Sequence, residues 1–534
     1  MRTTTATRDV LMTENPQEIR TERPQQPNEP GPYDVVLARG RVVDPETGTD
    51  KVLDVGITGE RIAAISAEPL EGETVIDATG LVVAPGFIDL HAHGQQLPAA
   101  WMQAFDGVTT ALELESGLLP IADFYDQVAA EGRPINYGAS AAWTYARIAE
   151  KEKDLAPPKA ELTWFQKAFE RDGWQQSLAD EEEVKRIIAG VEEGLDQGAL
   201  GIGINGGYAP GYGRKEYHAL AQLAARHGVP TFTHIRYLSV QEPDSGFEGL
   251  GELISLAAAT GAHMHICHLN SVAGRDVKAC VELVTEAQER GLPITVEAYP
   301  YGACSSTVGA EVFKNDWLAR WGVDDASAME YNGEPLTQER IDELQKEDPG
   351  AVIVMHFLHP DDNAEDAEML DLSVLHPGAA IASDAMPWAR KDGTIIEGDA
   401  WPLPDDAFAH PRSAGCYARF LAGWARGGRE RTEPKLTLVE AIRKTSLIPA
   451  QILEKAVPQM RSKGRVQVGA DADIVVFDLA TVQDNATFTE PAQRSTGFQH
   501  VIVNGTPIIQ DGKEILEARP GRPIRRPTAP KASV

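Results

Sequence analysis

Long apolar runs and cysteines are both scarce in this sequence, and the two scarcities exclude several classes of protein. No apolar run is long enough to cross a bilayer, and the N-terminus lacks the apolar segment of a signal peptide. The four cysteines among 534 residues follow no zinc-ribbon or disulfide-framework spacing, which is typical of a reducing compartment. The sequence therefore predicts a cytoplasmic protein with no membrane partner.

Basic residues are scarce relative to acidic ones. The chain has 49 lysines and arginines against 80 acidic residues, which gives a formal net charge of −31. Nucleic acids bind surfaces rich in lysine and arginine, so this balance argues against a nucleic-acid partner. The excess of negative charge fits a soluble, self-repelling surface. Assembly of identical subunits into a homo-oligomer stays open.

The length and the local patterns predict a large barrel domain with a smaller domain beside it. Residues 1–32 are polar and rich in proline, which predicts a disordered tail. Short strand-like runs separated by turn residues fill 33–82 and return in 458–517. We therefore expect a small β-sandwich domain built from both ends of the chain. Residues 518–534 are rich in proline and arginine and predict a second loose tail.

Residues 83–457 alternate strand-like and helical runs, the pattern of repeated βα units on a parallel sheet. Eight such units predict an α/β fold, a closed (β/α)₈ barrel of the TIM type. The strand-like runs are 87–91, 108–115, 135–141, 199–204, 230–234, 263–268, 294–299 and 379–384. An insertion is expected near 309–350. The apolar run 351–357 is either the true seventh strand or part of that insertion.

Two histidines end the first barrel strand. His91 and His93 are separated by one residue, so in a β-strand their side chains point to the same face. Neutral imidazoles placed in this way can bind one metal ion. Two further histidines, His263 and His265, lie earlier in their own strand, and we expect them to be structural.

Other side chains that can bind a metal end other strands. The second strand carries Glu113 and Glu115 on one face, and we favour Glu115 because it lies nearer the rim. His234, His268 and Asp384 end the fifth, sixth and eighth strands. The reactive groups of a barrel lie at the C-terminal ends of its strands. The predicted metal ligands are therefore His91, His93, Glu115, His234, His268 and Asp384.

This set of donors predicts a reaction class. Imidazole and carboxylate ligands suit zinc, with manganese or iron as alternatives. Such a metal lowers the pKa of a bound water to about 7 and polarises a carbonyl group. An aspartate beside that water, here Asp384, can take its proton and pass it to a leaving nitrogen. The sequence predicts metal-assisted hydrolysis of a C–N bond in a small-molecule substrate.

Taken together, the motifs resemble those of the amidohydrolase superfamily and, within it, the N-acyl-D-amino-acid deacylases (D-aminoacylases). The resemblance covers about residues 33–517 and is carried by the runs 85–93, 107–110, 198–201, 208–211, 233–236, 267–269, 299–301, 383–384, 410–412 and 469–478. It implies a zinc-dependent deacylase with one or two zinc ions. The implied zinc ligands are His91, His93, His234 and His268, and Asp384 is the implied catalytic acid/base.

The resemblance also implies residues that bind the substrate. Arg412 matches an arginine that grips the substrate α-carboxylate, which suits a bidentate guanidinium group; the alternative is an ordinary surface ion pair. Tyr299 and Ser306 match positions that help to hold the same carboxylate. Arg236, in the run that contains His234, and Asn270 complete the predicted substrate-binding residues.

Three departures from the family pattern bear on the metal and the substrate. Glu115 stands where the family has a metal-bridging cysteine, and a carboxylate hardens the site and favours two metals or a different metal. Asn270 stands in place of a family lysine, which argues against a preference for acidic substrates. The loop 385–409 is longer and carries Trp388 and Trp401, so it can cover the pocket and admit a bulkier, apolar substrate.

Two alternatives stay open beside the deacylase. The same barrel and metal can act on another carboxylate-bearing amide, a cyclic amide or a dipeptide. The chain can also be an inactive member of the superfamily that serves as a binding subunit, although the intact histidines and Asp384 argue against it.

Overall fold

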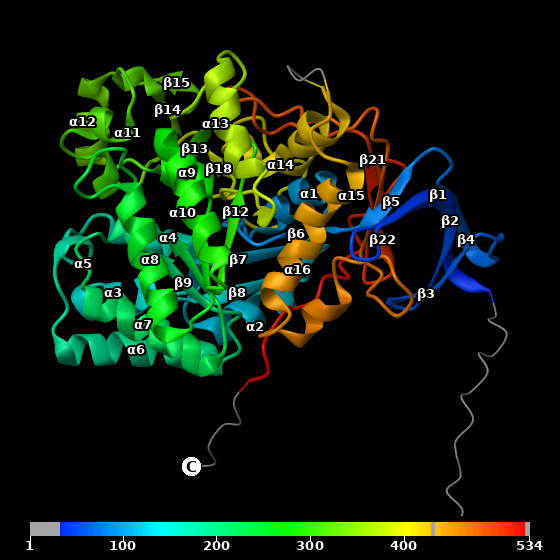
Figure 1. The fold of residues 1–534 in the computed structure, drawn as a ribbon, viewed down its shortest axis with the longest axis horizontal. Helices are drawn as coiled ribbons and strands as arrows, with labels where there is room; N and C mark the ends of the chain where they lie inside the picture. The colour runs from blue at the N-terminus through cyan, green and yellow to red at the C-terminus, as the bar shows by residue number, and fades with distance from the viewer. Residues whose placement is uncertain (1–31, 429–432, 529–534) are drawn as a thin grey trace, which may run out of the picture.

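The computed structural model describes residues 32–428 and 433–528, and its centre is a nearly closed barrel of eight parallel strands (Figure 1). The strand order is β17-β12-β11-β10-β9-β8-β7-β6, so neighbours in the barrel follow one another along the chain. The strands are β6 (Phe87–Asp89), β7 (Val108–Leu118), β8 (Asn136–Ala142), β9 (Ile202–Asn205), β10 (Thr231–His234), β11 (Met264–Ile266), β12 (Ile294–Ala298) and β17 (Ala379–Ile381). The predicted barrel fold is confirmed.

Loop and side-chain contacts join β6 to β17, where no regular strand ladder runs. The Asp89 carboxylate accepts a hydrogen bond from the Ser383 N–H at 3.0 Å. The Ala385 N–H donates to the His91 carbonyl at 3.3 Å, and the His93 N–H donates to the Ala385 carbonyl at 2.8 Å. These contacts hold the histidine pair at the end of β6 against the segment that follows β17.

Helices surround the barrel and cover its strands (Figure 1). They are α1 (Leu97–Phe105), α2 (Ile121–Glu131), α3 (Trp143–Lys151), α4 (Leu162–Ala168), α5 (Gly173–Gln176), α6 (Glu181–Asp196), α7 (Arg214–His227), α8 (Gly246–Thr260), α9 (Leu269–Ala273), α10 (Val277–Glu289), α11 (Trp317–Trp321), α12 (Gln338–Glu347), α13 (Ala364–Val374), α14 (Arg412–Phe420), α15 (Leu438–Ile442) and α16 (Ile448–Leu453). In α6, the buried Ile187, Val191 and Leu195 recur every four residues and face the core. Across the described residues, no helix combines the length and the apolar character that a membrane span requires.

Strands from both ends of the chain form one nine-stranded sheet beside the barrel, at the right of Figure 1. Its order is β23-β22-β21-β20-β5-β1-β2-β3, with β4 paired to β1. The bounds are β1 (Tyr33–Asp44), β2 (Thr49–Thr58), β3 (Arg61–Ser66), β4 (Gly72–Asp77), β5 (Val82–Pro85), β20 (Ile474–Phe477), β21 (Phe498–Val503), β22 (Thr506–Gln510) and β23 (Lys513–Glu514). β5 joins the two halves, because it pairs parallel to β1 and antiparallel to β20.

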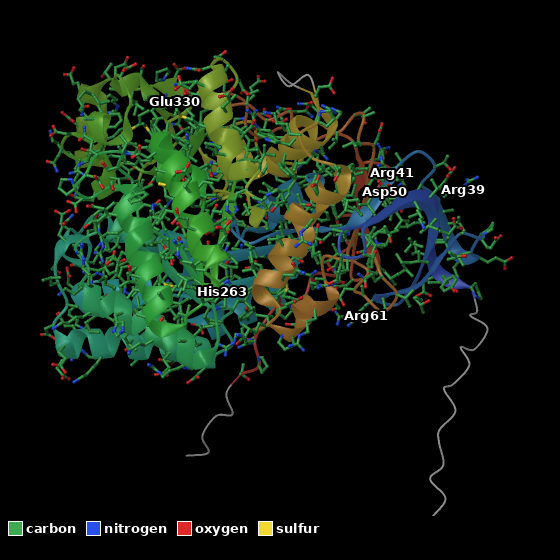
Figure 2. All side chains as sticks on the ribbon, viewed as in Figure 1. Arg39, Arg41, Asp50, Arg61, His263 and Glu330 are labelled. Atoms are coloured by element: carbon green, nitrogen blue, oxygen red, sulfur yellow. The ribbon has the colours of Figure 1, made fainter. Side chains whose placement is uncertain are left out.

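The nine-stranded sheet has an apolar interior and charged side chains on its exposed surface. Val83 and Ile474 are fully buried in its hydrophobic cluster. Arg41 and Asp50 form an ion pair across β1 and β2, with Nε 2.7 Å from Oδ1. Figure 2 shows both residues, with Arg61, on the side of the molecule away from the barrel.

The ninth apolar run lies outside the barrel. β16 (Val352–His356) belongs to a four-stranded antiparallel sheet of order β13-β16-β14-β15, with β13 (Ala303–Thr307), β14 (Met329–Tyr331) and β15 (Glu334–Pro335). This sheet begins before the predicted start of the insertion at residue 309 and continues past its predicted end at 350. The long loop 385–409 carries a small two-stranded sheet, β18 (Ala389–Arg390) with β19 (Ala407–Phe408).

The C-terminal segment packs against the barrel, so the prediction of a loose tail is wrong for residues 518–528. The Ile524 N–H donates to the Tyr137 carbonyl at 2.7 Å, and the Tyr125 hydroxyl donates to the Ile524 carbonyl at 2.7 Å. The Ile524 side chain is buried in a hydrophobic cluster that includes Leu112 and Phe232. The proline and arginine content of this segment did not indicate that it packs against the barrel, because the contacts are made largely by main-chain groups. The predicted tail 1–32 lies outside the described residues, apart from Pro32.

The packing of Ile524 predicts a measurable contribution to stability. Ile524→Ala should lower the free energy of unfolding by about 2–5 kcal/mol, because it removes buried methyl groups and leaves a cavity. Urea unfolding followed by circular dichroism measures the change. Val468→Ala is the matched control, because Val468 is 65% exposed. Equal unfolding midpoints for the two variants would contradict the packing described here.

Candidate metal centre

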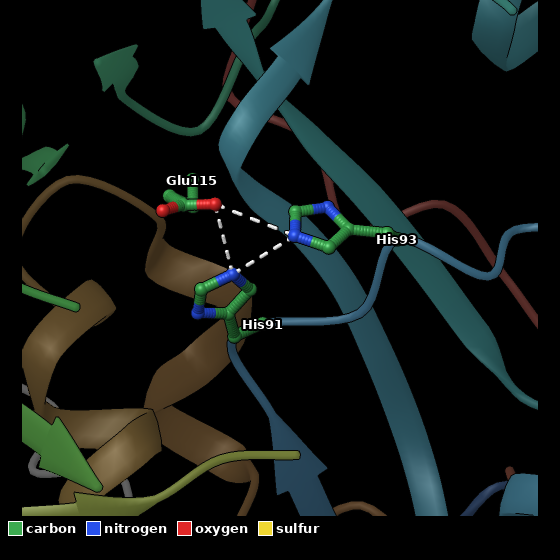
Figure 3. Close-up of side chains that lie close together, drawn as sticks. All are labelled: His91, His93 and Glu115. Atoms are coloured by element: carbon green, nitrogen blue, oxygen red, sulfur yellow. Dashed lines mark hydrogen bonds and ion pairs between the residues drawn. The ribbon is translucent and has the colours of Figure 1, made fainter. Parts of the chain in front are cut away.

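Two histidines at the end of β6 point their Nε2 atoms at a common centre, and each is held from behind by a glutamate. The two Nε2 atoms lie 3.1 Å apart (Figure 3). His91 Nδ1 is 2.5 Å from Glu297 Oε1, and His93 Nδ1 is 2.9 Å from Glu113 Oε2. Since an ionised carboxylate only accepts hydrogen bonds, each Nδ1 is the donor. Both Nε2 lone pairs are thereby left for a metal.

The Glu115 carboxylate lies between two pairs of histidines. Its Oε2 atom is 3.1 Å from His91 Nε2 and 3.3 Å from His93 Nε2 (Figure 3). Its Oε1 atom is 2.7 Å from His234 Nδ1 and 3.1 Å from His268 Nε2. Glu115 is thus the carboxylate between the two pairs.

An irregularity in the backbone of β7 accompanies the different positions of its two glutamates, Glu113 and Glu115. Glu113 and Glu115 share one face of the strand, so strand parity alone does not distinguish them. The pairing of β7 with β8 slips between Glu113 and Leu118. Gly117 has a φ of 63° at this irregularity, a backbone conformation that glycine adopts most readily. The Gly117 N–H donates to Glu113 Oε1 at 3.3 Å, which keeps that carboxylate beside His93.

Asp384, which follows the eighth barrel strand β17, also contacts the first histidine pair. Its Oδ1 atom is 3.4 Å from His91 Nε2 and 3.3 Å from His93 Nε2. Its Oδ2 atom is 2.7 Å from Arg412 Nη2, and Arg412 Nε donates to the Asp384 carbonyl at 2.6 Å. Asp384 and His268 both have positive φ, 51° and 31°. Such strained backbone at non-glycine residues gathers at functional sites.

Neighbouring groups keep the buried carboxylates ionised. Burial by itself would raise the pKa of Asp384, but the positive charge of Arg412 holds that pKa below its ordinary value. Burial also opposes ionisation of Glu297, yet His91 and His265 lower its pKa to about 2. Negative oxygens therefore surround the histidine nitrogens.

The donor set fits a pair of metal ions. Four groups of three donor atoms lie within 4.8 Å of one another among the described residues, and two of them share Glu115: one with His91 and His93, the other with His234 and His268. The buried Nδ1 of His268 has no hydrogen-bond partner in the described structure. Nitrogen and carboxylate oxygen donors suit zinc, manganese or iron. The residues thus form a candidate binuclear metal site.

A cavity opens directly onto this cluster. It has a volume of about 60 Å³ and is lined by Glu115, His234, His268 and Asp384 among others. Its apolar walls are Phe165, Leu238, Val312, Phe313, Trp321, Val352 and Met386, and its hydroxyl groups come from Ser116, Tyr208, Ser271, Ser305, Ser306 and Thr307. The described lining contains no lysine or arginine.

The cavity continues into a larger outer groove. The groove has a volume of about 680 Å³ and lies between the segment around α4, the insertion and the loop 385–409. Gln166, Ser305, Val352 and Met386 line both spaces. The predicted role of the loop in covering the pocket agrees with this position, although neither Trp388 nor Trp401 is among the lining residues.

The residues predicted to bind substrate fall into two groups. Ser306 lines the cavity and its hydroxyl lies 3.0 Å from that of Tyr208. The buried Arg412 guanidinium lies behind Asp384, 4.7 Å from the centre of the Tyr299 ring, and neither Arg412 nor Tyr299 is among the residues that line the cavity.

Arg236 and Asn270 do not line the cavity and are bound elsewhere. Arg236 donates from Nε and Nη2 to the two carboxylate oxygens of Glu252, both at 2.9 Å, so this arginine is already paired. The Asn270 amide donates to the carbonyls of Tyr299 and Tyr301 at 3.2 and 3.1 Å, which fixes the segment after β12.

Sequence reasoning missed Glu297. It accepts hydrogen bonds from both His91 and His265, at 2.5 and 2.9 Å. The signal in the sequence was an acidic residue inside the otherwise apolar strand 294–298. His265 is structural, as expected, and so is His263, whose Nε2 lies 2.8 Å from the Thr295 hydroxyl. Figure 2 shows His263 far from Glu330 of the insertion.

Comparison with known proteins gives consistent matches along most of the chain. A family model described as "Amidohydrolase family" matches residues 74–279 and 158–509. An N-acyl-D-glutamate deacylase from Alcaligenes xylosoxydans xylosoxydans is 28% identical, over 92% of this chain and 96% of that protein. A D-aminoacylase from the same organism is also 28% identical, over 90% of this chain and 95% of its own length.

Solved structures show the same fold. The crystal structure of an N-acyl-D-glutamate deacylase from Bordetella bronchiseptica, in complex with zinc and a phosphonate inhibitor that mimics the tetrahedral intermediate, superposes with a TM-score of 0.67. The two sequences are 23% identical, and the match covers 93% of this chain and 100% of the other. At this identity the likeness supports the fold.

The position of Glu115 predicts a change in metal affinity. Glu115→Gln keeps the size of the side chain and removes its negative charge, so affinity for zinc should fall by about 10–100-fold. Competition with a chromogenic chelator measures the affinity, and metal content after dialysis measures the stoichiometry. Glu181→Gln is the control, because Glu181 is exposed on α6. Unchanged affinity and stoichiometry in Glu115→Gln would refute the bridging position.

Proposed function

This chain belongs to the amidohydrolase family, and from that premise we propose that it is a zinc-dependent deacylase of N-acyl-D-amino acids. The observation that carries the proposal is the convergence of two histidine pairs on Glu115 at 2.7–3.3 Å, with Asp384 at 3.3–3.4 Å from one of those pairs. The relatives named as D-aminoacylase and N-acyl-D-glutamate deacylase support the choice of substrate class. We propose zinc in one or two positions, with other divalent metals as alternatives.

The proposed ligands are the residues that meet at the centre, and the proposed proton carrier is among them. His91, His93, Glu115, His234, His268 and Asp384 would hold the metal. When bound, zinc supplies an acidified water and a polarised amide carbonyl. Asp384 is ionised, so its free lone pairs can accept the proton of the attacking water. The same carboxyl group then donates this proton to the leaving nitrogen as the C–N bond breaks.

Arg412 has two parts in the proposal. Its contacts of 2.6 and 2.7 Å with the Asp384 carbonyl and carboxylate fix the position of the proton carrier. Its Nη1 atom makes only a 3.5 Å contact, with the Ala303 carbonyl, and is left for the α-carboxylate of the substrate. Tyr299 stacks on the same guanidinium and Ser306 lines the cavity, so both stay proposed contacts of that carboxylate.

The cavity favours an apolar side chain on the substrate. Phe165, Leu238, Phe313 and Trp321 form its walls, and its described lining offers no basic side chain to an acidic substrate. Asn270 is engaged with main-chain carbonyls and cannot take the place of a lysine as a counter-charge. We therefore propose N-acyl derivatives of leucine-like or phenylalanine-like D-amino acids.

A substrate panel tests the proposed activity. The zinc-loaded protein should release amino acid from N-acetyl-D-leucine and N-acetyl-D-phenylalanine, and should act much more slowly on N-acetyl-D-glutamate and on N-acetyl-L-leucine. A coupled assay for free amino acids measures the rates. If the protein hydrolyses neither enantiomer, the proposal is wrong. A cyclic amide added to the panel then tests the alternative activity, hydrolysis of a cyclic amide by the same barrel and metal.

The role of Asp384 predicts a loss of turnover without loss of metal. Asp384→Asn should lower kcat by about 10²–10⁴-fold, because an amide cannot accept and return the proton. Metal content should stay near that of the wild type, since the histidines and Glu115 remain. Asp392→Asn, at an exposed position of the same loop, is the control. Retained turnover in Asp384→Asn would exclude it as the proton carrier.

A further inference from the structure

An unpaired strand edge lies beside the metal centre. β13 is the outermost strand of its sheet, and its one neighbour is β16. In an antiparallel pair, residues alternate between those that bond to the neighbouring strand and those whose main-chain groups face away. The Phe357 N–H donates to the Gly302 carbonyl at 3.0 Å, and the Val308 N–H donates to the Ala351 carbonyl at 2.9 Å. The even-numbered residues of this strand therefore bond to β16.

The main-chain groups of Ala303, Ser305 and Thr307 consequently face the open side. The Ala303 carbonyl accepts a bond from His410 Nε2 at 3.2 Å, and the Thr307 carbonyl accepts one from the Ala310 N–H at 3.1 Å. No described residue bonds to the N–H or carbonyl of Ser305, or to the N–H of Thr307. Two N–H donors, of Ser305 and Thr307, and one acceptor, the Ser305 carbonyl, thus stay free on this short stretch of β13.

This free stretch lies at the junction between the metal cavity and the outer groove. Ser305 lines both spaces, and Thr307 lines the cavity. The Ala303 end of the strand lies against Arg412, at 3.5 Å from its Nη1 atom. A substrate whose α-carboxylate is bound at Arg412 would therefore run past the metal centre and along Ser305 toward the groove.

We propose that the acyl part of the substrate is a peptide, and that its main chain pairs with the free edge of β13. The inference rests on the proposed function and narrows it to short peptides that end in a D-amino acid. Peptides commonly bind by adding a strand to an exposed sheet edge, because main-chain hydrogen bonds form whatever the side chains. Water adds OH to the last peptidyl carbonyl carbon and a proton to the nitrogen, so a shortened peptide and a free D-amino acid leave.

The geometry also explains the size of the groove. A strand rises by about 3.3 Å per residue, so Ser305 and Thr307 span the length of two substrate residues. A simple acetyl group would occupy only the inner cavity of about 60 Å³ and leave the groove of about 680 Å³ without a role in binding.

Three substrates test the inference on the zinc-loaded full chain: N-acetyl-D-leucine, acetyl-glycyl-glycyl-D-leucine, and the same peptide with both glycine nitrogens methylated. The unmodified peptide should have a kcat/KM about tenfold above that of N-acetyl-D-leucine, the effect of two modest main-chain hydrogen bonds. Methylation should abolish this advantage. Hydrolysis of N-acetyl-D-leucine without any advantage for the peptide would overturn the inference and leave the proposed function standing. Hydrolysis of none of the three would remove both.

A pair of variants at one position tests the strand edge itself. Ser305→Pro removes the outward N–H, and proline is tolerated on edge strands where that N–H is not used by the ladder. Ser305→Ala is its matched control, because both substitutions remove the hydroxyl that donates to the Ile353 carbonyl at 2.9 Å. The ratio of peptide to acetyl kcat/KM should fall about fivefold in Ser305→Pro and hold in Ser305→Ala. Equal ratios in the two variants would overturn the pairing. Should Ser305→Pro not fold, the methylated peptide decides the same question.

Discussion

The bridge that Glu115 makes between two histidine pairs is the contact on which the rest of the molecule depends. Its two oxygens are buried within 2.7–3.3 Å of four imidazole nitrogens from three different strand ends. A buried carboxylate is costly unless opposite charge or a metal compensates it. Here the groups around Glu115 come from separate strand ends, so they meet only when those barrel strands pack side by side. Assembly of the barrel and assembly of the candidate centre therefore depend on the same strand packing.

Residues behind the proposed ligands fix the orientation of the ligand side chains. Glu297 and Glu113 fix the rings of His91 and His93 through their Nδ1 atoms, so both Nε2 lone pairs face inward in one tautomer. Arg412 holds Asp384 from two sides. The left-handed backbone of Asp384 and His268 keeps a strained geometry that the surrounding contacts must stabilise. Three of the six proposed ligands, His91, His93 and Asp384, are thus held by carboxylate or guanidinium partners.

Much of the fold and of the centre could be predicted, for reasons visible in particular residues. Buried parallel strands appear in the sequence as apolar runs, and all eight such runs lie on barrel strands. Parity and strand ends bring His91, His93, His234, His268 and Asp384 together. The choice between Glu113 and Glu115 depends on an irregularity at Gly117, which no periodicity reveals. Glu297 has its role through a contact with His91, 206 positions away in the sequence. The placement of residues 518–528 rests mainly on main-chain bonds, and composition carries no information about those.

β5 connects the strands from both ends of the polypeptide to the segment that leads into the histidine pair. β5 lies between β1 and β20, and the Gly86 N–H that follows it donates to the Asp473 carbonyl at 2.9 Å. One residue later begins β6, and the histidine pair follows its last residue, Asp89. During synthesis on the ribosome, β5 and its neighbour Gly86 have no C-terminal partner until Asp473 and β20 have been made. The segment leading into β6 is thus anchored late in synthesis, after all eight barrel strands have been made.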